Sequence, residues 1–215
     1  MYELELGDYE AQFASRRIAS DVRDDTAAPK SALLFLRILG SAFDRLPEAV
    51  RTLHSRVPQR WEGMAAVERG SSIVARLLAA LFGFPRAAEA VPIAVDIGQH
   101  DGTEHWRRSF GGRDFSSHLS AGRGRWERLI VERFGPFAFG IALVLDGSTL
   151  RYVVRRWSVC GVPLPSAWAP GGVTREFDDA GRFGFDVEIR HRIIGLIVRY
   201  KGWLAPAATP GGATP

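Results

Sequence analysis

Cysteine is almost absent from this chain: Cys160 is the only one among 215 residues. A single thiol excludes an internal disulfide framework and a cysteine-rich metal site. We therefore expect the protein to fold in a reducing compartment, the cytoplasm. Cys160 stands in V-C-G-V-P at the end of an apolar stretch and has no neighbouring base, so we expect it to be buried and unreactive.

Long apolar runs and dense charge of one sign are also missing. The most apolar stretches, I-V-A-R-L-L-A-A-L-F-G-F-P and R-I-I-G-L-I-V, are shorter than the roughly 20 residues that cross a bilayer, so membrane contact would be at most peripheral. The net charge is only +4 and no five consecutive residues are basic, so we expect no nucleic-acid partner. The first ten residues are acidic where a signal peptide is basic, and we expect no secretion signal.

Several motifs of enzymes and cofactor-binding proteins are missing too. No G-x-G-x-x-G follows a strand, which excludes the usual dinucleotide site, and no G-x-S-x-G marks a hydrolase nucleophile. His100 and His105 flank an expected turn, and no pair of histidines has the spacing of a zinc site. We therefore expect neither a metal nor a cofactor.

The periodicity of the remaining chain divides it into a helical part and a part made of strands. Residues 1–29 and 205–215 lack any apolar period, and we expect a flexible leader and a disordered tail. A single domain, 30–204, lies between them, helical over 30–85 and stranded over 91–204. Helices are predicted before Pro47, over 47–55 and after Gly70-Ser71-Ser72. Arg76 is the only charge in this last helix, over 72–82, so we expect it to be covered on most sides or to meet an apolar partner.

The second part reads as strands joined by tight turns. Asp101-Gly102 and Asp146-Gly147 favour hairpins, and D-D-A-G-R marks a further turn. Loops this short require antiparallel neighbours. Around residues 136–146 one strand face carries only small residues, and we expect the helix 72–82 to lie against it. The sequence therefore predicts an α+β fold: a strongly curved antiparallel sheet or open barrel of about eight to nine strands, with N-terminal helices packed on or in it.

Matching phrases occur in order along most of this domain: L-G-S-A-F-D-R-L-P-E-A-V-R-T-L-H (39–54), V-E-R-G (67–70), W-R-R-S-F-G-G-R-D-F-S-S (106–117), E-R-F-G-P-F (132–137), G-V-P-L-P (161–165), and G-R-F-G-F-D-V-E-I with I-G-L-I-V-R-Y-K-G-W-L (181–204). Together they resemble a bacterial family described as a domain of unknown function, number 4166. The resemblance implies no particular activity and no catalytic residues. Members of that family also occur joined to the C-terminal side of NAD(P)-dependent oxidoreductase domains, which suggests an oxidoreductase as a partner.

Strand alternation singles out a few polar side chains on apolar faces. Trp106, Arg108 and Phe110 share one face, and an arginine drawn inward needs a carboxylate. That carboxylate could come from the protein, with Asp114, Glu132 and Asp186 as candidates, or from a ligand. Histidines are the other candidates. His54 ends a short helix and His191 lies on the apolar face of its strand, where each is either a packed histidine or a functional one.

The leading hypothesis is non-catalytic binding of an apolar small molecule or lipid with a polar or acidic head in the concave face of the sheet. The predicted ligand contacts are Phe137, Phe139, Phe183 and Phe185 for the apolar part, and Arg108, Trp106 and His191 for the head. Two alternatives stay open. One is an enzyme in which His54 or His191, with Asp186, performs acid–base chemistry. The other is an accessory domain that docks on an oxidoreductase or a membrane surface through the apolar helix.

Overall fold

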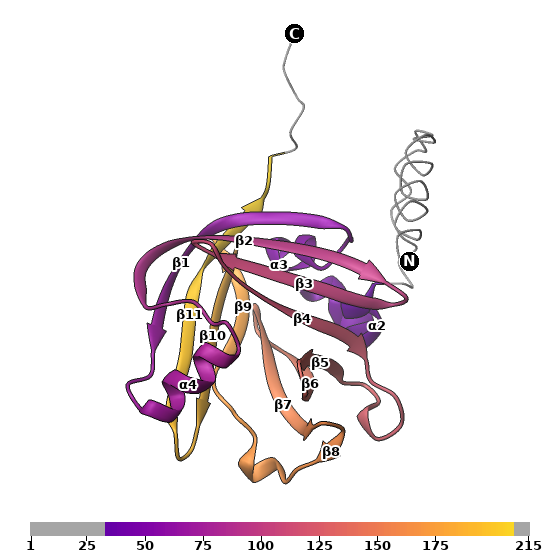
Figure 1. Cartoon of the computed structure of the whole chain (residues 1–215). Coiled ribbons are helices and arrows are strands. Elements are labelled where there is room, and N and C mark those ends of the chain that lie inside the picture. The colour runs from indigo at the N-terminus through magenta and orange to yellow at the C-terminus, as the bar shows by residue number, and fades with distance from the viewer. Residues whose placement is uncertain (1–32, 209–215) are drawn as a thin grey trace, which may run out of the picture.

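The computed structural model describes residues 33–208, so the predicted leader 1–29 and residues 209–215 of the predicted tail lie outside this range. Strands dominate it, and the short helices stand before and between the first strands (Figure 1). The elements in chain order are α2 (Leu34–Leu39), η2 (Gly40–Arg45), α3 (Glu48–Leu53), β1 (Gln59–Arg69), α4 (Ile73–Leu81), β2 (Ala88–His100), β3 (Thr103–Phe110), β4 (Arg113–Ala121), η3 (Gly124–Trp126), β5 (Ile130–Phe134), β6 (Phe137–Asp146), β7 (Thr149–Val159), β8 (Val162–Pro163), η4 (Ser166–Trp168), β9 (Thr174–Asp179), β10 (Arg182–His191) and β11 (Gly195–Pro206).

Ten of the strands close into an antiparallel barrel. The strand order is β6-β5-β4-β3-β2-β1-β11-β10-β9-β7, and pairing of β6 with β7 closes the ring, while β8 adds to β7 outside it. The prediction of a curved antiparallel sheet is confirmed. The fold is mostly antiparallel β with few helices, and it has ten barrel strands and one extra strand instead of the expected eight to nine. The expected open edge was wrong, because closure pairs both edges of the ten barrel strands.

The strand β1 accounts for the largest error in the prediction. The segment was assigned to the helical part, yet it pairs with β2 on one side and β11 on the other. Its inward positions include Trp61, Ala65 and Val67, all buried, so it does alternate. Small residues on the inner face made that alternation too weak to distinguish from a helical pattern.

The predicted turns are where the sequence placed them. Asp101 and Gly102 adopt φ of 48° and 73° between β2 and β3, as a two-residue hairpin requires, and Gly147 has φ of 58° between β6 and β7. Gly111 and Gly112, with φ of 53° and 85°, make the same kind of connection between β3 and β4. These tight turns place consecutive strands side by side and so set most of the strand order.

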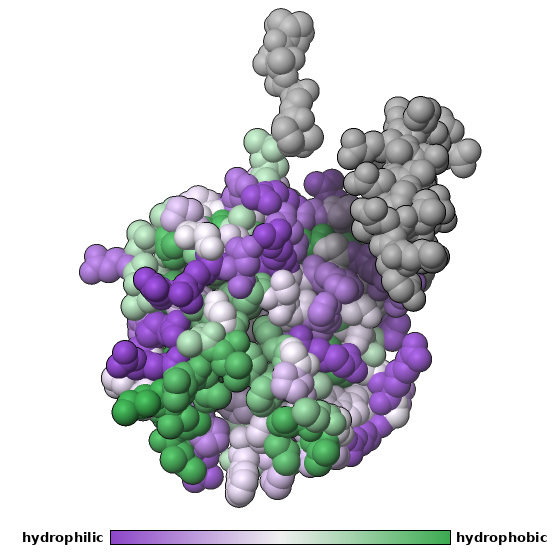
Figure 2. Space-filling view, in the orientation of Figure 1, coloured by the Kyte–Doolittle hydropathy of each residue, from purple (hydrophilic) through white to green (hydrophobic). Residues whose placement is uncertain are grey.

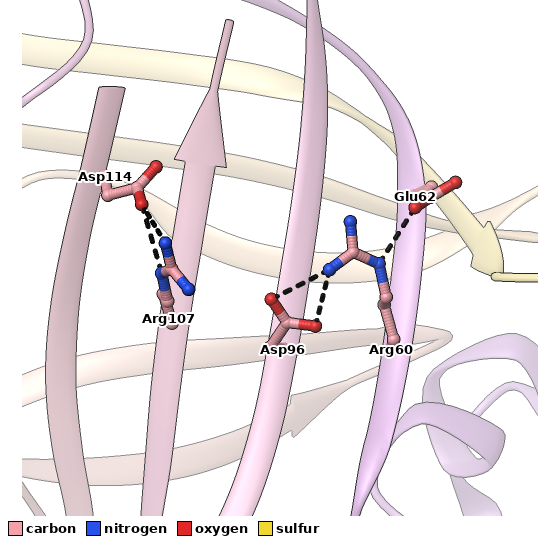
Figure 3. Close-up of polar contacts among 5 residues, drawn as sticks. All are labelled: Arg60, Glu62, Asp96, Arg107 and Asp114. Atoms are coloured by element: carbon pink, nitrogen blue, oxygen red, sulfur yellow. Dashed lines mark hydrogen bonds and ion pairs between the residues drawn. The ribbon is translucent and has the colours of Figure 1, made fainter. Parts of the chain in front are cut away.

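The outer face of the barrel carries several ion pairs, whereas the inner face is mostly apolar. On β1 and β2, Arg60 lies 2.9 Å from an oxygen of Asp96 and 2.9 Å from one of Glu62 (Figure 3). Arg107 of β3 pairs with Asp114 of β4 in the same view (Figure 3). Such exposed pairs contribute only about 0–1 kcal/mol each. These pairs favour the observed strand register, because it places opposite charges next to each other on neighbouring strands.

The N-terminal helices cap one end of the barrel. Phe35 of α2 and Leu53 of α3 are fully buried, and the Phe35 ring lies 6.5 Å from Trp106 of β3 and 6.4 Å from Tyr152 of β7. His54, directly after α3, stacks on Phe35 at 3.5 Å between ring centroids. The helices therefore reach into the barrel, as predicted.

The helix α4 packs on β11 instead (Figure 1). The side chain of Ser72 caps it by accepting from the Ala75 amide at 3.1 Å, as predicted. Of its nine residues only Ala75 and Ala79 are buried, and its large aliphatic side chains mostly face solvent. The expectation of cover on most sides was therefore wrong, and the alternative, an apolar partner, stays a prediction. Within 33–208, no helix is both long and apolar enough to span a bilayer.

The small-residue face of β6 is not covered by α4 either. Trp126 fills that space, since a Cβ at Gly140 would lie 2.6 Å from the Trp126 ring and 3.0 Å from Leu129. The loop that carries η3 therefore folds back over β6. Room beside small residues was predicted correctly, but its occupant was not.

Candidate functional site

A cavity of about 170 Å³ lies inside the barrel. Five of the predicted ligand residues line it: Trp106, Arg108, Phe139, Phe183 and Phe185. Further walls come from apolar side chains of β2, β6, β10 and β11, and from the polar groups of Glu132, Tyr152, Glu176 and Tyr200. The interior is thus apolar with a polar cluster, which is the usual composition of a small-molecule site.

A second cavity, of about 220 Å³, lies at the α4 end of the barrel and is almost wholly apolar. Phe137, Phe139 and His191, which were also predicted, line it together with Leu78 and Phe82. We call it the mouth cavity. It shares the lining residues Phe134, Phe139, Pro170 and Ile189 with the inner cavity, so the two adjoin.

Arg108 lines the inner cavity, and a carboxylate of the protein balances its charge. Its Nη1 donates to the hydroxyl of Ser117 at 2.9 Å, which in turn donates to Glu132 Oε1 at 2.8 Å, and Nη2 lies 3.7 Å from the same oxygen. The guanidinium also lies over the Trp106 ring, 5.1 Å from its centroid. Of the three predicted carboxylates, Glu132 is therefore the partner.

A second polar group joins the cap to the barrel wall. His54 Nε2 lies 2.7 Å from Glu176 Oε2, and the Tyr152 hydroxyl donates to Glu176 Oε1 at 2.6 Å. Burial, followed by the neighbouring Glu176 charge, raises the pKa of Tyr152 well above its usual value, so its hydroxyl stays a donor. If Nε2 carries the proton, Nδ1 is a buried acceptor, and it has no hydrogen-bond partner among the described residues.

Glu104 lies next to this group on β3. It accepts from the Trp106 indole N–H at 2.9 Å, and burial raises its pKa. The protein therefore favours the protonated, neutral form of Glu104 more than water does. Among the described residues, the charged side chains that line the cavity are Arg108, Glu132, Glu176 and Glu188. This wall carries no uncompensated positive charge.

Two other predicted site residues lie elsewhere. Asp186 is on the outer face of β10, where it accepts from Arg199 at 2.9 Å and from Arg175 at 3.1 Å. It pairs with neither histidine, so the predicted histidine–Asp186 pair was wrong; the carboxylate beside His54 is Glu176. His191 reaches the mouth, where its Nδ1 accepts from the Ile193 amide at 3.3 Å.

No pattern in the sequence marked Glu176 as a site residue, and Cys160 was expected to be buried. Glu176 sits on a short strand, T-R-E-F-D-D, whose apolar positions are too few to define an inner face. Cys160 is exposed, contrary to expectation, because it occupies a turn with φ of 50° after β7. An apolar run before a residue does not bury that residue when the chain turns there.

A larger hollow of about 790 Å³ lies on the outside, lined by polar groups that include Arg37, Arg123, Arg125 and Arg133. All four arginines are exposed to solvent. Water would compete with any anion bound there, so the hollow offers weak recognition. The two adjoining inner cavities remain the candidate site.

The comparison with protein families covers most of the barrel. The model of the family described as "Domain of unknown function (DUF4166)" matches residues 46–204, from the cap to the end of β11. No curated protein matches the sequence significantly.

Proposed function

Because the chain belongs to the domain of unknown function family DUF4166 and forms a closed barrel with an internal cavity, we propose that it binds one small, mainly apolar molecule inside the barrel. The ligand's polar head lies at Arg108, Tyr152 and Glu176, and its apolar part extends past Phe139 into the mouth cavity. One observation carries the proposal. An apolar passage formed by two adjoining cavities has hydrogen-bonding groups at its inner part.

The size of the cavities supports a compact ligand. An apolar protein cavity of about 150 Å³ holds a molecule the size of benzene. The inner cavity, at about 170 Å³, therefore suits one ring or a short chain, and the mouth cavity, at about 220 Å³, suits an apolar tail.

The charges favour a neutral head over the acidic one that the sequence also allowed. Arg108 already has Glu132, and Glu176 stands on the same wall, so an anionic head would meet two carboxylates. Tyr200 lines the cavity, and its hydroxyl makes no hydrogen bond to another described residue. A hydroxyl, carbonyl or amide head would hydrogen-bond there without bringing in a new charge.

Binding is favoured over catalysis by the position of His54. Its side chain is 1% exposed and it does not line either inner cavity. A bound molecule touches Tyr152 and Glu176 but not the imidazole. The His54 contact thus holds the Glu176 carboxylate in place from the side that faces away from the cavity.

A series of probes with one alkyl tail and three heads tests the proposal. A medium-chain alcohol, the carboxylic acid and the amine of equal length are titrated by calorimetry against the full chain. The alcohol is expected to bind most tightly, since it adds no charge to the wall. Absence of binding by all three to a folded protein would overturn the proposal.

A substitution in the shared wall of the two cavities provides the structural control. Ile189→Trp should weaken binding of the alcohol by at least about tenfold, because the indole fills the passage. Val144→Trp places the same ring on an exposed position of β6 and should bind as wild type does. Equal affinities of the two variants would count against binding inside the barrel.

A further inference from the structure

Exposed apolar side chains stand on the three segments that line the mouth cavity, which are α4, η4 and the β10–β11 turn. Ile73, Leu77 and Leu81 of α4 are 74%, 66% and 75% exposed, Ile193 in the β10–β11 turn is 90% exposed, and Trp168 of η4 is 67% exposed. We call these five residues the mouth rim. Figure 2 shows hydrophobic surface gathered over α4 and near β8, on the lower side of the molecule, whereas polar surface covers much of the rest of that view.

Contacts between the three segments hold the mouth rim together. The Ser72 hydroxyl donates to the Ile194 carbonyl at 3.0 Å, which ties the start of α4 to the β10–β11 turn. Trp168 lines the mouth cavity together with Leu78 of α4 and Ile194. The inner side of each segment thus forms the wall of the cavity, and its outer side faces solvent.

The three segments that carry the mouth rim contain basic residues and no acidic ones. Residues 69–88, 155–173 and 189–195 contain no aspartate or glutamate. Their exposed basic residues are Arg76, Arg86, Arg155, Arg156, Arg190 and Arg192. The nearest acid on β10, Glu188, is paired with Arg190 at 3.2 Å. An apolar surface bordered by arginines matches the acyl chains and anionic headgroups of a lipid bilayer.

We propose that the mouth rim inserts into the surface of an anionic membrane and opens the mouth cavity directly to the lipid phase. The bilayer is then the source or destination of the apolar ligand, a step that rests on the proposed binding function. A second copy of this chain fits the surface less well, because a symmetric contact would place Arg76 and Arg192 against like charges.

Vesicle flotation with the full chain tests the membrane contact. Vesicles of phosphatidylcholine with about 30% phosphatidylserine should carry the protein, and pure phosphatidylcholine should carry much less of it. Leu77→Asp should reduce flotation at least about tenfold, because a charge replaces an inserted aliphatic group. Val144→Asp, at an exposed apolar position away from the mouth, should float as wild type does.

Two further variants in the flotation experiment test the role of the arginines. Arg76→Glu and Arg192→Glu should each lower binding to the phosphatidylserine vesicles by at least about fivefold. Equal flotation on both kinds of vesicle, or equal loss in Leu77→Asp and Val144→Asp, would overturn the inference. So would self-association of the free protein that Leu77→Asp abolishes, since it would make a second copy the occupant.

The alcohol titration separates this inference from the binding function. Leu77 lines neither cavity, so Leu77→Asp should bind the soluble alcohol with unchanged affinity. Alcohol binding without flotation would refute the membrane contact alone. Flotation without alcohol binding would refute the ligand function and leave the membrane contact standing.

Discussion

Tyr152 and Tyr200 stand on the same cavity wall but have different hydrogen-bond environments. Tyr152 donates to Glu176, whereas Tyr200 bonds to no other described residue through its hydroxyl. Tyr152→Phe should therefore lower the free energy of unfolding by about 1–3 kcal/mol, because a buried carboxylate loses one of two donors. Tyr200→Phe should change it by less than about 0.5 kcal/mol. Urea unfolding at neutral pH measures both, and equal losses would contradict the assigned role of Glu176.

Glu104 and Asp186 predict opposite pH dependences. Burial raises the pKa of Glu104, so the folded state holds its proton more tightly than the unfolded chain. That stabilisation is complete below the unfolded pKa of about 4.3 and is lost as pH rises through the folded pKa. Glu104→Gln should therefore gain stability relative to wild type as pH rises from about 4 to 7. A constant difference across urea-unfolding curves in this range would refute the assignment.

For Asp186 the sign reverses, because its hydrogen bond with Arg199 lowers the pKa of its carboxyl. Its contribution is present above the unfolded pKa of about 3.9 and disappears as pH falls through the lower, folded value. Asp186→Asn should thus be less stable than wild type at pH 7 by about 2 kcal/mol, and the gap should narrow in acid. The same unfolding series checks it, and a gap that widens in acid would contradict it.

At the level of single residues, strand alternation predicted direction well and partners less well. Alternation with Trp106 and Phe110 was enough to place Arg108 inside the barrel. Its partner Glu132 was one of three candidates, and the choice depends on which strands become neighbours. Glu176 meets His54 across 122 residues of chain, and no local pattern carries that information.

Gly140 allows a prediction at the level of elements. A Cβ at this position of β6 would meet the Trp126 ring at 2.6 Å, whereas at Gly98 of β2 nothing lies within 4 Å. Gly140→Val should displace Trp126 and destabilise the protein by about 1–3 kcal/mol, with a change in tryptophan fluorescence. Gly98→Val should have little effect on either measurement. A stable Gly140→Val with an unchanged spectrum would show that Trp126 does not pack there.

The elements best predicted from sequence were those fixed by local chemistry. The Ser72 cap and the Asp101-Gly102 hairpin depend on neighbouring residues only, and both are present. The sequence of α4 left two outcomes open, because an apolar helix is either covered or meets an apolar partner. Its large aliphatic side chains are exposed, and that is the property from which the membrane contact is inferred.

The ladder between β7 and β9, which we call the seam, is one of the two shortest in the barrel. Four residue pairs join these strands, from Thr149↔Phe177 to Tyr152↔Thr174, as four pairs join β4 and β5, against nine pairs between β1 and β11. The Tyr152–Glu176 hydrogen bond crosses this seam on the inside. The turn signals in the sequence set the consecutive pairings, β6 with β7 included, but they contain nothing about the pairing of β7 with β9 or of β1 with β11. An open sheet was therefore the natural prediction.

The seam leads to a prediction for hydrogen exchange. Its amides should exchange at least about tenfold faster than those between β1 and β11, because opening it breaks fewer ladder bonds. Addition of the alcohol probe should slow exchange at Tyr152 and Glu176, since the ligand contacts both strands. Equal protection of the β7–β9 and β1–β11 amides, with or without the probe, would contradict this prediction.

The absence of acidic residues beside the mouth has a consequence for kinetics. The three segments that form the mouth hold exposed arginines and no acidic residue, so the electrostatic potential beside the mouth is locally positive. A negatively charged surface would attract this part of the molecule before any contact forms. The association rate, and not only the affinity, should then fall as ionic strength rises.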